Sequence, residues 1–165
     1  MAVPSVHRAS PDEWRVYRQV RLATLREAPS AFWTTLADAT LVTEEVWRRW
    51  LTVGGCFVAV IDGTPVGLAA GFREEDGTAE LISMWVDPSW RGRGVAGQLV
   101  TAVTEWAARD GFATVHLWVA VGNDAAERLY ARHQFARSGR VQAMHPDEPA
   151  RREFEMVRAV TIGAP

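Results

Sequence analysis

Residues 86–99 read VDPSWRGRGVAGQL, and this stretch decides the fold. An apolar run ends at Asp87-Pro88, a glycine-rich turn follows, and a helix begins near Gly94. The first amides of a helix have no partner within it, and the helix dipole adds partial positive charge there. Glycine lets the chain turn tightly and lets a ligand approach the backbone closely. We therefore expect a site for a phosphate or pyrophosphate at this turn, with Arg91 and Arg93 beside it.

A glycine-rich turn alone is a weak signal, and other interpretations compete with this one. A P-loop ends in Gly-Lys-Ser or Gly-Lys-Thr, and the chain contains no Lys, so that interpretation fails. A dinucleotide-binding fold carries an acid about 20 residues after such a loop. Asp110 has a similar spacing, but it ends the predicted helix, and three predicted antiparallel strands precede the turn. A purely structural turn is a further alternative.

Hydrophobic patterning predicts the elements on either side of the turn. A helix starts at Ser10-Pro11, which supplies an N-cap and a proline at the first helical position, and it ends near Pro29. Thr43 caps a second, shorter helix. Apolar runs bounded by turn residues predict the strands, and a helical period predicts two later helices. The expected strands are 57–61, 65–72, 79–86, 115–121, 139–144 and 153–161, and the later helices are 94–109 and 123–133.

The order of these elements, β-α-α-β-β-β-α-β-α-β-β, predicts a mixed α/β (α+β) fold. The consecutive strands 57–61, 65–72 and 79–86 on short turns form an antiparallel meander. The strand–helix–strand unit after them should be a right-handed crossover between parallel strands. Because the chain shows no linker, repeat or low-complexity tract, we expect a single domain over residues 1–165.

The composition disfavours several classes of function. Twenty acidic and eighteen basic side chains leave a net charge of −2, which gives no electrostatic reason to expect nucleic acid or an anionic membrane as partner. Without Lys the chain cannot form the Schiff base of pyridoxal phosphate enzymes. Cys56, the single cysteine, is expected in the core, and the four His show no metal-ligand spacing. No segment resembles a signal peptide or a membrane span, and we expect a cytoplasmic protein.

Two segments resemble conserved motifs of the GNAT superfamily of N-acetyltransferases. RGRGVA at residues 91–96 resembles the signature Arg/Gln-x-x-Gly-x-Gly/Ala, and MWVDP at residues 84–88 resembles the strand end before it. The predicted order of elements also matches the GNAT fold, a mixed, mostly antiparallel central sheet flanked by helices, over nearly the whole chain. A further stretch of this chain, Asn123-x-x-Ala126-x-x-Leu129-Tyr130 followed by Phe135, resembles the second conserved segment of the family.

The resemblance implies an N-acetyltransferase that moves the acetyl group of acetyl-CoA to a primary amine by direct attack on the thioester. In the family, two middle strands splay apart and the coenzyme enters the gap. Residues 84–86 would pair with the pantetheine arm, and the loop amides would hold the pyrophosphate. The implied cofactor-binding residues are Met84, Trp85, Val86, Arg91, Gly92, Arg93, Gly94, Val95, Ala96, Gly97, Asn123, Ala126 and Tyr130.

The same resemblance makes Tyr130 the general acid that protonates the departing thiolate. Glu80 is the carboxylate best placed for a general base, which would take the proton of the amine directly or through water. Under strict alternation Glu80 shares a face with Ile82, Met84 and Val86, unless a bulge breaks the strand. The alternatives are a core aromatic at Tyr130, a helix cap alone at Asn123, and a solvent-facing strand residue at Glu80.

The acceptor pocket of the family is built by the first two helices, their connection and the last hairpin. In this chain these segments contain Phe32 and Trp33, which we expect to bind the acceptor. Trp118 stands where ribosomal-protein acetyltransferases carry a glutamate base, so a small-molecule amine is favoured over a protein N-terminus. A non-catalytic acyl-CoA-binding regulatory module is the main alternative function. We expect a monomer or a homodimer, and no metal.

Overall fold

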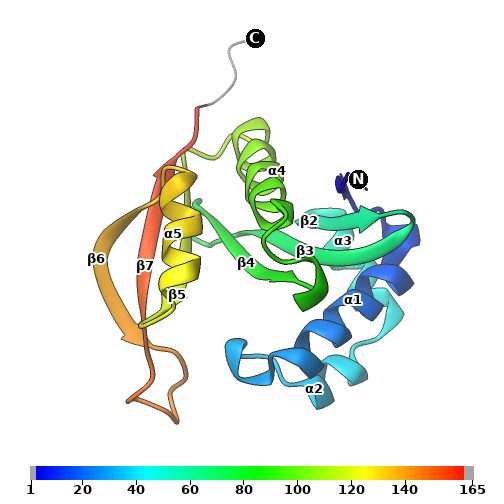
Figure 1. Cartoon of the computed structure of the whole chain (residues 1–165), viewed down its shortest axis with the longest axis horizontal. Coiled ribbons are helices and arrows are strands. Elements are labelled where there is room, and N and C mark those ends of the chain that lie inside the picture. Colours follow the sequence, from blue (N-terminus) through cyan, green and yellow to red (C-terminus); the bar gives the residue numbers. More distant parts are fainter. Residues whose placement is uncertain (1–2, 162–165) are drawn as a thin grey trace.

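Within residues 3–161, which the computed structural model describes, seven strands form one open sheet in the order β1-β2-β3-β4-β5-β7-β6 (Figure 1). Neighbouring strands are antiparallel except β4 and β5, which are parallel. This arrangement confirms the predicted mixed sheet. The strands are β1 (Ser5–Arg8), β2 (Gly55–Ile61), β3 (Thr64–Arg73), β4 (Ala79–Val86), β5 (Thr114–Ala120), β6 (Ala136–Ala143) and β7 (Arg152–Ala159). The helices are α1 (Trp14–Glu27), α2 (Leu36–Leu41), α3 (Glu44–Val53), α4 (Val95–Arg109) and α5 (Asp124–Arg132).

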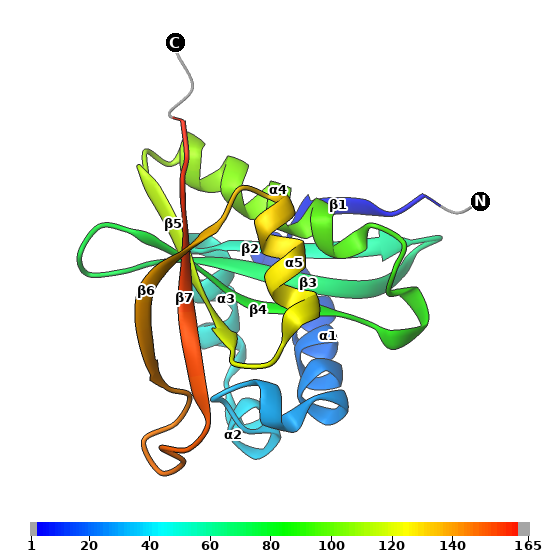
Figure 2. The same ribbon diagram turned by 60° about the vertical axis from the view of Figure 1, so that its left-hand side comes forward.

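Helices cover both faces of the sheet (Figures 1 and 2). On one face, α1 and α3 contribute Tyr17 and Trp47 to a buried cluster with side chains of β2, β3 and β4. On the other face, α4 and α5 contribute Leu99, Trp106 and Tyr130 to a larger cluster. Burial of these apolar side chains is the main force that holds the layers together. The central strands therefore have a core on each side.

A short helix, α2, was not predicted from the sequence. Thr35 caps it, because its hydroxyl oxygen accepts a hydrogen bond from the amide of Asp38 at 3.1 Å. The helix has six residues, and its buried residue is Ala39. Such a short segment cannot display a helical period. The segment between β1 and β2 therefore contains three α-helices rather than the two expected.

Strand β6 begins earlier than predicted. It starts at Ala136, whereas the expected start was Gly139. The register between β6 and β7 shifts between Arg137 and Val141, and Gly139 has a φ of 94°. Glycine adopts this backbone angle without strain, so Gly139 marks an irregularity inside the strand rather than its start.

Strand β4 contains a bulge at Ser83. Leu68 of β3 pairs with Trp85, but Ala70 pairs with Ile82, so β4 has one residue more than β3 between these pairs. Ser83 carries the irregularity and has a φ of 59°. Bulges of this kind bend a strand and increase its twist.

The bulge makes the prediction of strict alternation along β4 wrong. That prediction placed Glu80, Ile82, Met84 and Val86 on one face. In the structure Met84 and Val86 pack in the cluster below α4, whereas Ile82 packs on the opposite face together with Trp85. The extra residue shifts the side-chain alternation by one position, which moves every later side chain to the other face.

Strands β4 and β5 pair over a short stretch and then separate. Their pairs are Ala79 with Val115 and Glu80 with His116. From there the two strands diverge, as Figure 1 shows. Residues 81–86 of β4 therefore have no strand partner on the side of β5. This gap divides the sheet into a part with β1–β4 and a part with β5–β7.

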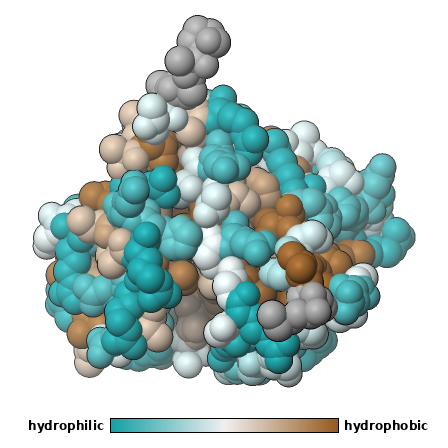
Figure 3. All heavy atoms as spheres, turned by 45° about the horizontal axis from the view of Figure 1, so that its top comes forward, coloured by the Kyte–Doolittle hydropathy of each residue, from teal (hydrophilic) through white to brown (hydrophobic). Residues whose placement is uncertain are grey.

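Hydrophilic side chains cover most of the molecular face in Figure 3, and hydrophobic ones gather in limited patches. Scattered apolar side chains are ordinary on a folded surface. Among residues 3–161, no helix has both the length and the apolar character needed to cross a membrane.

The packing of Trp106 gives a test of the fold. Gly55 and Gly71 pair across β2 and β3, and a Cβ atom added at either would overlap the Trp106 ring. Gly71→Ala should lower the free energy of unfolding by about 1–3 kcal/mol, because an overpacked site must shift. Urea denaturation measures this loss. The loss should shrink in a Trp106→Leu background, and an equal loss in both backgrounds would contradict the assigned contact.

Candidate active site

The turn between β4 and α4 presents a row of unpartnered backbone amides. Gly94 is the N-cap of α4 with a φ of 80°, and no side chain caps this end of the helix. The amide of Gln98 donates to the carbonyl of Gly94 at 3.2 Å. In the part of the chain that the structure describes, the amides of residues 92–97 donate to no acceptor. A row of free amides at the positive end of α4 suits a phosphate or pyrophosphate.

Arg91 fastens this turn to the rest of the fold. Its Nε donates to the carbonyl oxygen of Val86 at 3.0 Å, and its Nη2 donates to Oε2 of Glu27 at 2.9 Å. The same Glu27 oxygen accepts a hydrogen bond from Nε1 of Trp85 at 2.7 Å. The guanidinium of Arg91 therefore connects the turn to β4 and to α1, and its charge is paired with Glu27.

Arg93 is in a different situation from Arg91. Its guanidinium carbon lies 4.8 Å from the centre of the Trp90 ring, and it forms no ion pair within residues 3–161. Val95 is 1% exposed and anchors the first turn of α4 in the core. Gly97 lies against the His133 ring, since an added Cβ would be 3.0 Å from its Nε2 atom. Arg93 is thus the arginine of this turn that has charge to offer an anion.

Helix α5 begins at a cap and carries a buried tyrosine. Oδ1 of Asn123 accepts a hydrogen bond from the amide of Ala126 at 3.2 Å, so the predicted capping role is confirmed. Tyr130 is 7% exposed, and its ring meets Phe135 edge-on at a centroid distance of 5.9 Å. Its hydroxyl has no hydrogen-bond partner among the described residues, and burial raises the pKa of Tyr130. A phenol in this state keeps its proton at neutral pH, which is the form that a general acid needs.

Glu80 lies where β4 and β5 begin to separate. Burial raises its pKa to about 8, and a hydrogen bond with Glu74 and the charge of Glu74 add to the effect. Glu74, Glu80 and His116 each offer a ligand atom, and these atoms lie within 4.8 Å of one another. The spacing in the sequence gave no sign of this group. Two carboxyl groups and an imidazole suit a divalent ion, but one proton shared between the two carboxyl groups satisfies the same oxygen atoms.

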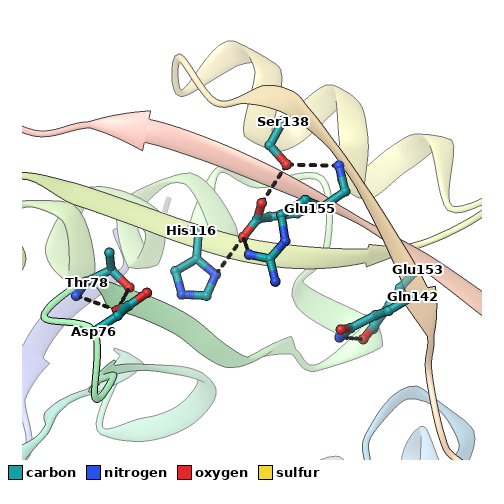
Figure 4. A network of polar contacts seen from close by, with 8 residues as sticks. Asp76, Thr78, His116, Ser138, Gln142, Glu153 and Glu155 are labelled. Atoms are coloured by element: carbon teal, nitrogen blue, oxygen red, sulfur yellow. Dashed lines mark hydrogen bonds and ion pairs between the residues drawn. The ribbon is translucent and has the colours of Figure 1, made fainter.

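A second polar group lies on β5, β6 and β7, across the gap from β4 (Figure 4). Glu155 is 4% exposed and accepts hydrogen bonds from the Ser138 hydroxyl and from Nη1 of Arg140, the latter at 3.0 Å. Nδ1 of His116 lies 3.4 Å from the Glu155 carboxylate. The charges of Glu153 and Glu155 also raise the pKa of Glu80. The gap therefore has a wall of acidic side chains, which attracts cations and disfavours a negative charge on Glu80.

A cavity of about 290 Å³ lies between the sheet and the first three helices. Its walls are mainly apolar and aromatic, with Tyr17 from α1 and Trp47 and Trp50 from α3. Its floor reaches Ser83, the bulged residue of β4. The cavity thus lies on the face opposite α4 and extends to the part of β4 that the separation of β5 leaves open.

The last hairpin touches the connection after α1. The Trp33 ring lies 4.6 Å from the ring of His145, and Nη2 of Arg151 donates to the carbonyl of Ser30 at 2.7 Å. The Phe32 ring packs instead beneath Arg21, whose guanidinium carbon is 4.8 Å from its centre. Neither Phe32 nor Trp33 lines the cavity itself: Phe32 packs against Arg21 of the cavity wall, and Trp33 is 66% exposed beside His145.

The sequence pattern did not single out Arg21, Glu27 and Glu155. A signal existed for Arg21, because it follows Tyr17 by one helical turn and so places a charge on the apolar face of α1. Glu155 alternates with Phe154 and Met156, a pattern that indicates the solvent face of a strand. The packing of the neighbouring strands on β7 buries it, which no local pattern reveals.

Comparison with known proteins adds family information to this geometry. The model of the acetyltransferase (GNAT) family matches residues 21–135. Human N-acetylaspartate synthetase is 42% identical over 88 residues, which are 52% of this chain and 29% of that protein. Mycothiol acetyltransferase of Brachybacterium faecium is 39% identical over 125 residues, which are 73% of this chain and 37% of that protein. The chain thus spans about a third of the length of these curated relatives.

A solved structure shares the fold over almost the whole chain. It is that of yncA, an acetyltransferase of Salmonella typhimurium, with its cofactor acetyl-CoA. The TM-score is 0.76 at 18% identity, with 99% of this chain and 97% of that chain covered. The residues that match the family model begin in α1 and include β4, the turn before α4, and α5. The chain belongs to the acetyltransferase (GNAT) family, as the two sequence motifs indicated.

The raised pKa of Glu80 predicts how stability depends on pH. Between pH 4.5 and about 8 the folded chain holds a proton on this group that the unfolded chain has lost, so this group makes stability fall as pH rises. Glu80→Gln removes this contribution and should gain stability relative to the wild type between pH 5.5 and pH 8.5. Urea denaturation at both pH values measures the difference. Glu75→Gln, at an exposed neighbouring position, should show the same change of unfolding free energy with pH as the wild type. If Glu80→Gln also shows the wild-type change, the raised pKa of Glu80 is contradicted.

Proposed function

We propose that this chain is an N-acetyltransferase that moves the acetyl group of acetyl-CoA to the primary amine of a small molecule. One observation carries the proposal: the free amides of residues 92–97 lie at the end of β4, whose edge toward β5 is also unpaired. A coenzyme with a diphosphate and an extended, amide-bearing arm would satisfy both sets of groups. The name of one relative, mycothiol acetyltransferase, and the acetyl-CoA held by yncA support this choice of co-substrate.

Each predicted cofactor residue has a role in this proposal. The amides of the turn and Arg93 would hold the diphosphate, while Arg91 keeps the turn in place. The backbone of Met84, Trp85 and Val86 would pair with the pantetheine arm. An amide at the β4 bulge would donate a hydrogen bond to the thioester carbonyl and stabilise the negative charge that develops on its oxygen. At the start of α5, Asn123 and Ala126 would border the coenzyme.

The proposed chemistry needs two proton transfers. The amine nitrogen attacks the acetyl carbon, so a C–N bond forms and the C–S bond breaks. Glu80 takes the proton that the amine loses, directly or through water, and Tyr130 gives a proton to the departing sulfur. With a pKa of about 8, Glu80 gains its basic form as pH rises through that value, so the rate should rise over the same range.

The shape of the acceptor side supports a small molecule over a protein N-terminus. The cavity of about 290 Å³ is near the lower end of the range for small-molecule sites, about 300–1,000 Å³. The contact between Trp33 and His145 bridges the helices and the last hairpin, which narrows the approach. The alternative function is a regulatory module that binds acyl-CoA without catalysis; it would use the turn but need neither Glu80 nor Tyr130.

A large side chain at Gly94 tests the anion site. Gly94→Trp should lower the affinity for CoA at least tenfold, since the indole would occupy the space above the amides, where an added Cβ meets no atom within 4 Å. Gly63→Trp is the matched control, because Gly63 also has a positive φ and open surroundings but lies in the β2–β3 turn. Isothermal titration with CoA measures both variants. Equal affinities would refute the site.

Removal of the Tyr130 hydroxyl separates catalysis from binding. Tyr130→Phe should lower kcat by a factor of about 100–10,000, the usual range for loss of a general acid. Affinity for CoA and thermal stability should change little, because this hydroxyl has no hydrogen-bond partner among the described residues. Release of free thiol from acetyl-CoA with a panel of amines gives the rate. Retained CoA binding without turnover in the wild type would favour the regulatory module.

A further inference from the structure

We propose that Arg21 binds a carboxylate group of the acceptor, which makes the acceptor an amino carboxylate with an apolar side chain. The inference rests on the proposed transferase function and names the substrate class of that same site. Arg21 lies on α1, is partly buried, and is part of the wall of the 290 Å³ cavity. Three features support the inference: the unpaired charge of Arg21, the apolar walls of the cavity, and the acidic groups near its β4 side.

The charge of Arg21 has no counter-ion in the part of the chain that the structure describes. No carboxylate oxygen lies within 4.0 Å of its guanidinium nitrogens, and its Nη1 atom is buried without a hydrogen-bond partner. Burial lowers the pKa of Arg21, and no neighbouring carboxylate offsets this effect. The Phe32 ring, at 4.8 Å, offers a cation–π contact that orients the guanidinium but does not use its donors.

Two other arginines have carboxylate partners. Arg48 pairs with Asp12 at 2.9 Å and with Glu44 at 2.7 Å. Arg91 pairs with Glu27 at 2.9 Å. Arg158, which is also partly buried, has no carboxylate partner among the described residues, but it does not line the cavity. A partly buried charge without a partner is costly, and proteins keep such a charge where a ligand completes it. Arg21 therefore combines a missing counter-ion with a position in the cavity wall.

The rest of the cavity indicates the side chain of the acceptor. Its walls include Tyr17, Trp47, Trp50, Val42 and Ile82. Trp47 is 2% exposed, and its Nε1 donor is also buried without an acceptor. Aromatic and aliphatic walls favour an apolar or aromatic group, because its burial removes apolar surface from water. The residues that line the cavity therefore include a second buried donor without a partner, on Trp47.

The β4 side of the cavity suits an amine. Glu80 pairs across the strands with Phe72, so their side chains share a face of the sheet, and Phe72 and Ser83 line the cavity. Glu74 is hydrogen-bonded to Glu80, and the acidic residues of β7 lie beyond. The site therefore has a positive group on α1 and negative groups at the gap. This polarity matches a molecule that carries both a carboxylate and an ammonium group.

Matched pairs of acceptors test the proposal. L-phenylalanine and 2-phenylethylamine differ only by the carboxylate, as do L-leucine and isoamylamine. The wild type should use the amino acid of each pair with a kcat/KM about 10- to 100-fold higher, the effect of a charge-assisted hydrogen-bond pair. Thiol release from acetyl-CoA gives these values. Equal or greater use of the amines without a carboxylate, with transfer itself intact, would overturn the inference and leave the proposed function standing.

An Arg21→Met variant assigns the preference to this side chain. Methionine keeps an unbranched, flexible side chain and removes the charge and the N–H donors, so the preference for the carboxylate should disappear, mainly through a higher KM for the amino acids. The control is Arg18→Met on the same helix, where Nη2 of Arg18 donates only to the carbonyl of Thr40, at 3.4 Å, and the preference should persist. A preference that survives Arg21→Met in a folded variant would contradict the assignment.

A binding measurement separates this inference from the transferase function. 3-Phenylpropionate carries the carboxylate but no amine, and 3-phenylpropanamide is its neutral counterpart. The wild type should bind the acid at least about tenfold more tightly than the amide, and Arg21→Met should bind both equally. If the acid binds in this way but no amine releases thiol, the carboxylate site stands and the transferase function fails. If neither compound binds, or both bind equally to the wild type, the inference fails.

Discussion

The early separation of β4 from β5 is the constraint on which the site depends. The two strands pair at two positions and then diverge, so the edge of β4 between residues 81 and 86 faces an opening. Backbone N–H and C=O groups need partners, and here a neighbouring strand does not supply them. The bulge at Ser83 bends β4 in the same region. Because the free amides of α4 follow directly at the end of β4, one extended anionic ligand is able to use both.

Electrostatics divides the region into two ends of opposite character. The free amides, Arg93 and the dipole of α4 make one end positive. At the start of the gap, the carboxyl groups of Glu74 and Glu80 stand near a buried Glu155, whose charge is shared with Arg140 and the Ser138 hydroxyl. Burial, together with this crowding of acids, raises the pKa of Glu80, so Glu80 holds its proton to an unusually high pH. Under the proposed function, the same acids would attract an ammonium group, and Glu80 would serve as the base.

The position of the turn between β4 and α4 is fixed by residues far away in the sequence. Glu27 of α1 accepts hydrogen bonds from both Trp85 and Arg91, and Arg91 also binds the carbonyl of Val86. These contacts fix the end of β4 relative to α1, and α1 in turn carries Arg21 and Tyr17 to the cavity. The same small set of interactions therefore fixes the proposed coenzyme side of the sheet relative to the proposed acceptor side.

The sequence by itself determined the order of most elements, the glycine-rich turn and the Asn123 cap, because these depend on local periodicity and on contacts a few residues apart. It also carried the family motifs, which place β4, the turn and α5. It did not determine which face Met84 and Val86 occupy, because a bulge depends on the pairing of β4 with β3. It could not distinguish the anchored Arg91 from the free Arg93, nor reveal the buried Glu155 and the unpaired Arg21. Those properties arise from segments up to 64 residues apart, as for Arg91 and Glu27, and only the packed sheet and helices bring them together.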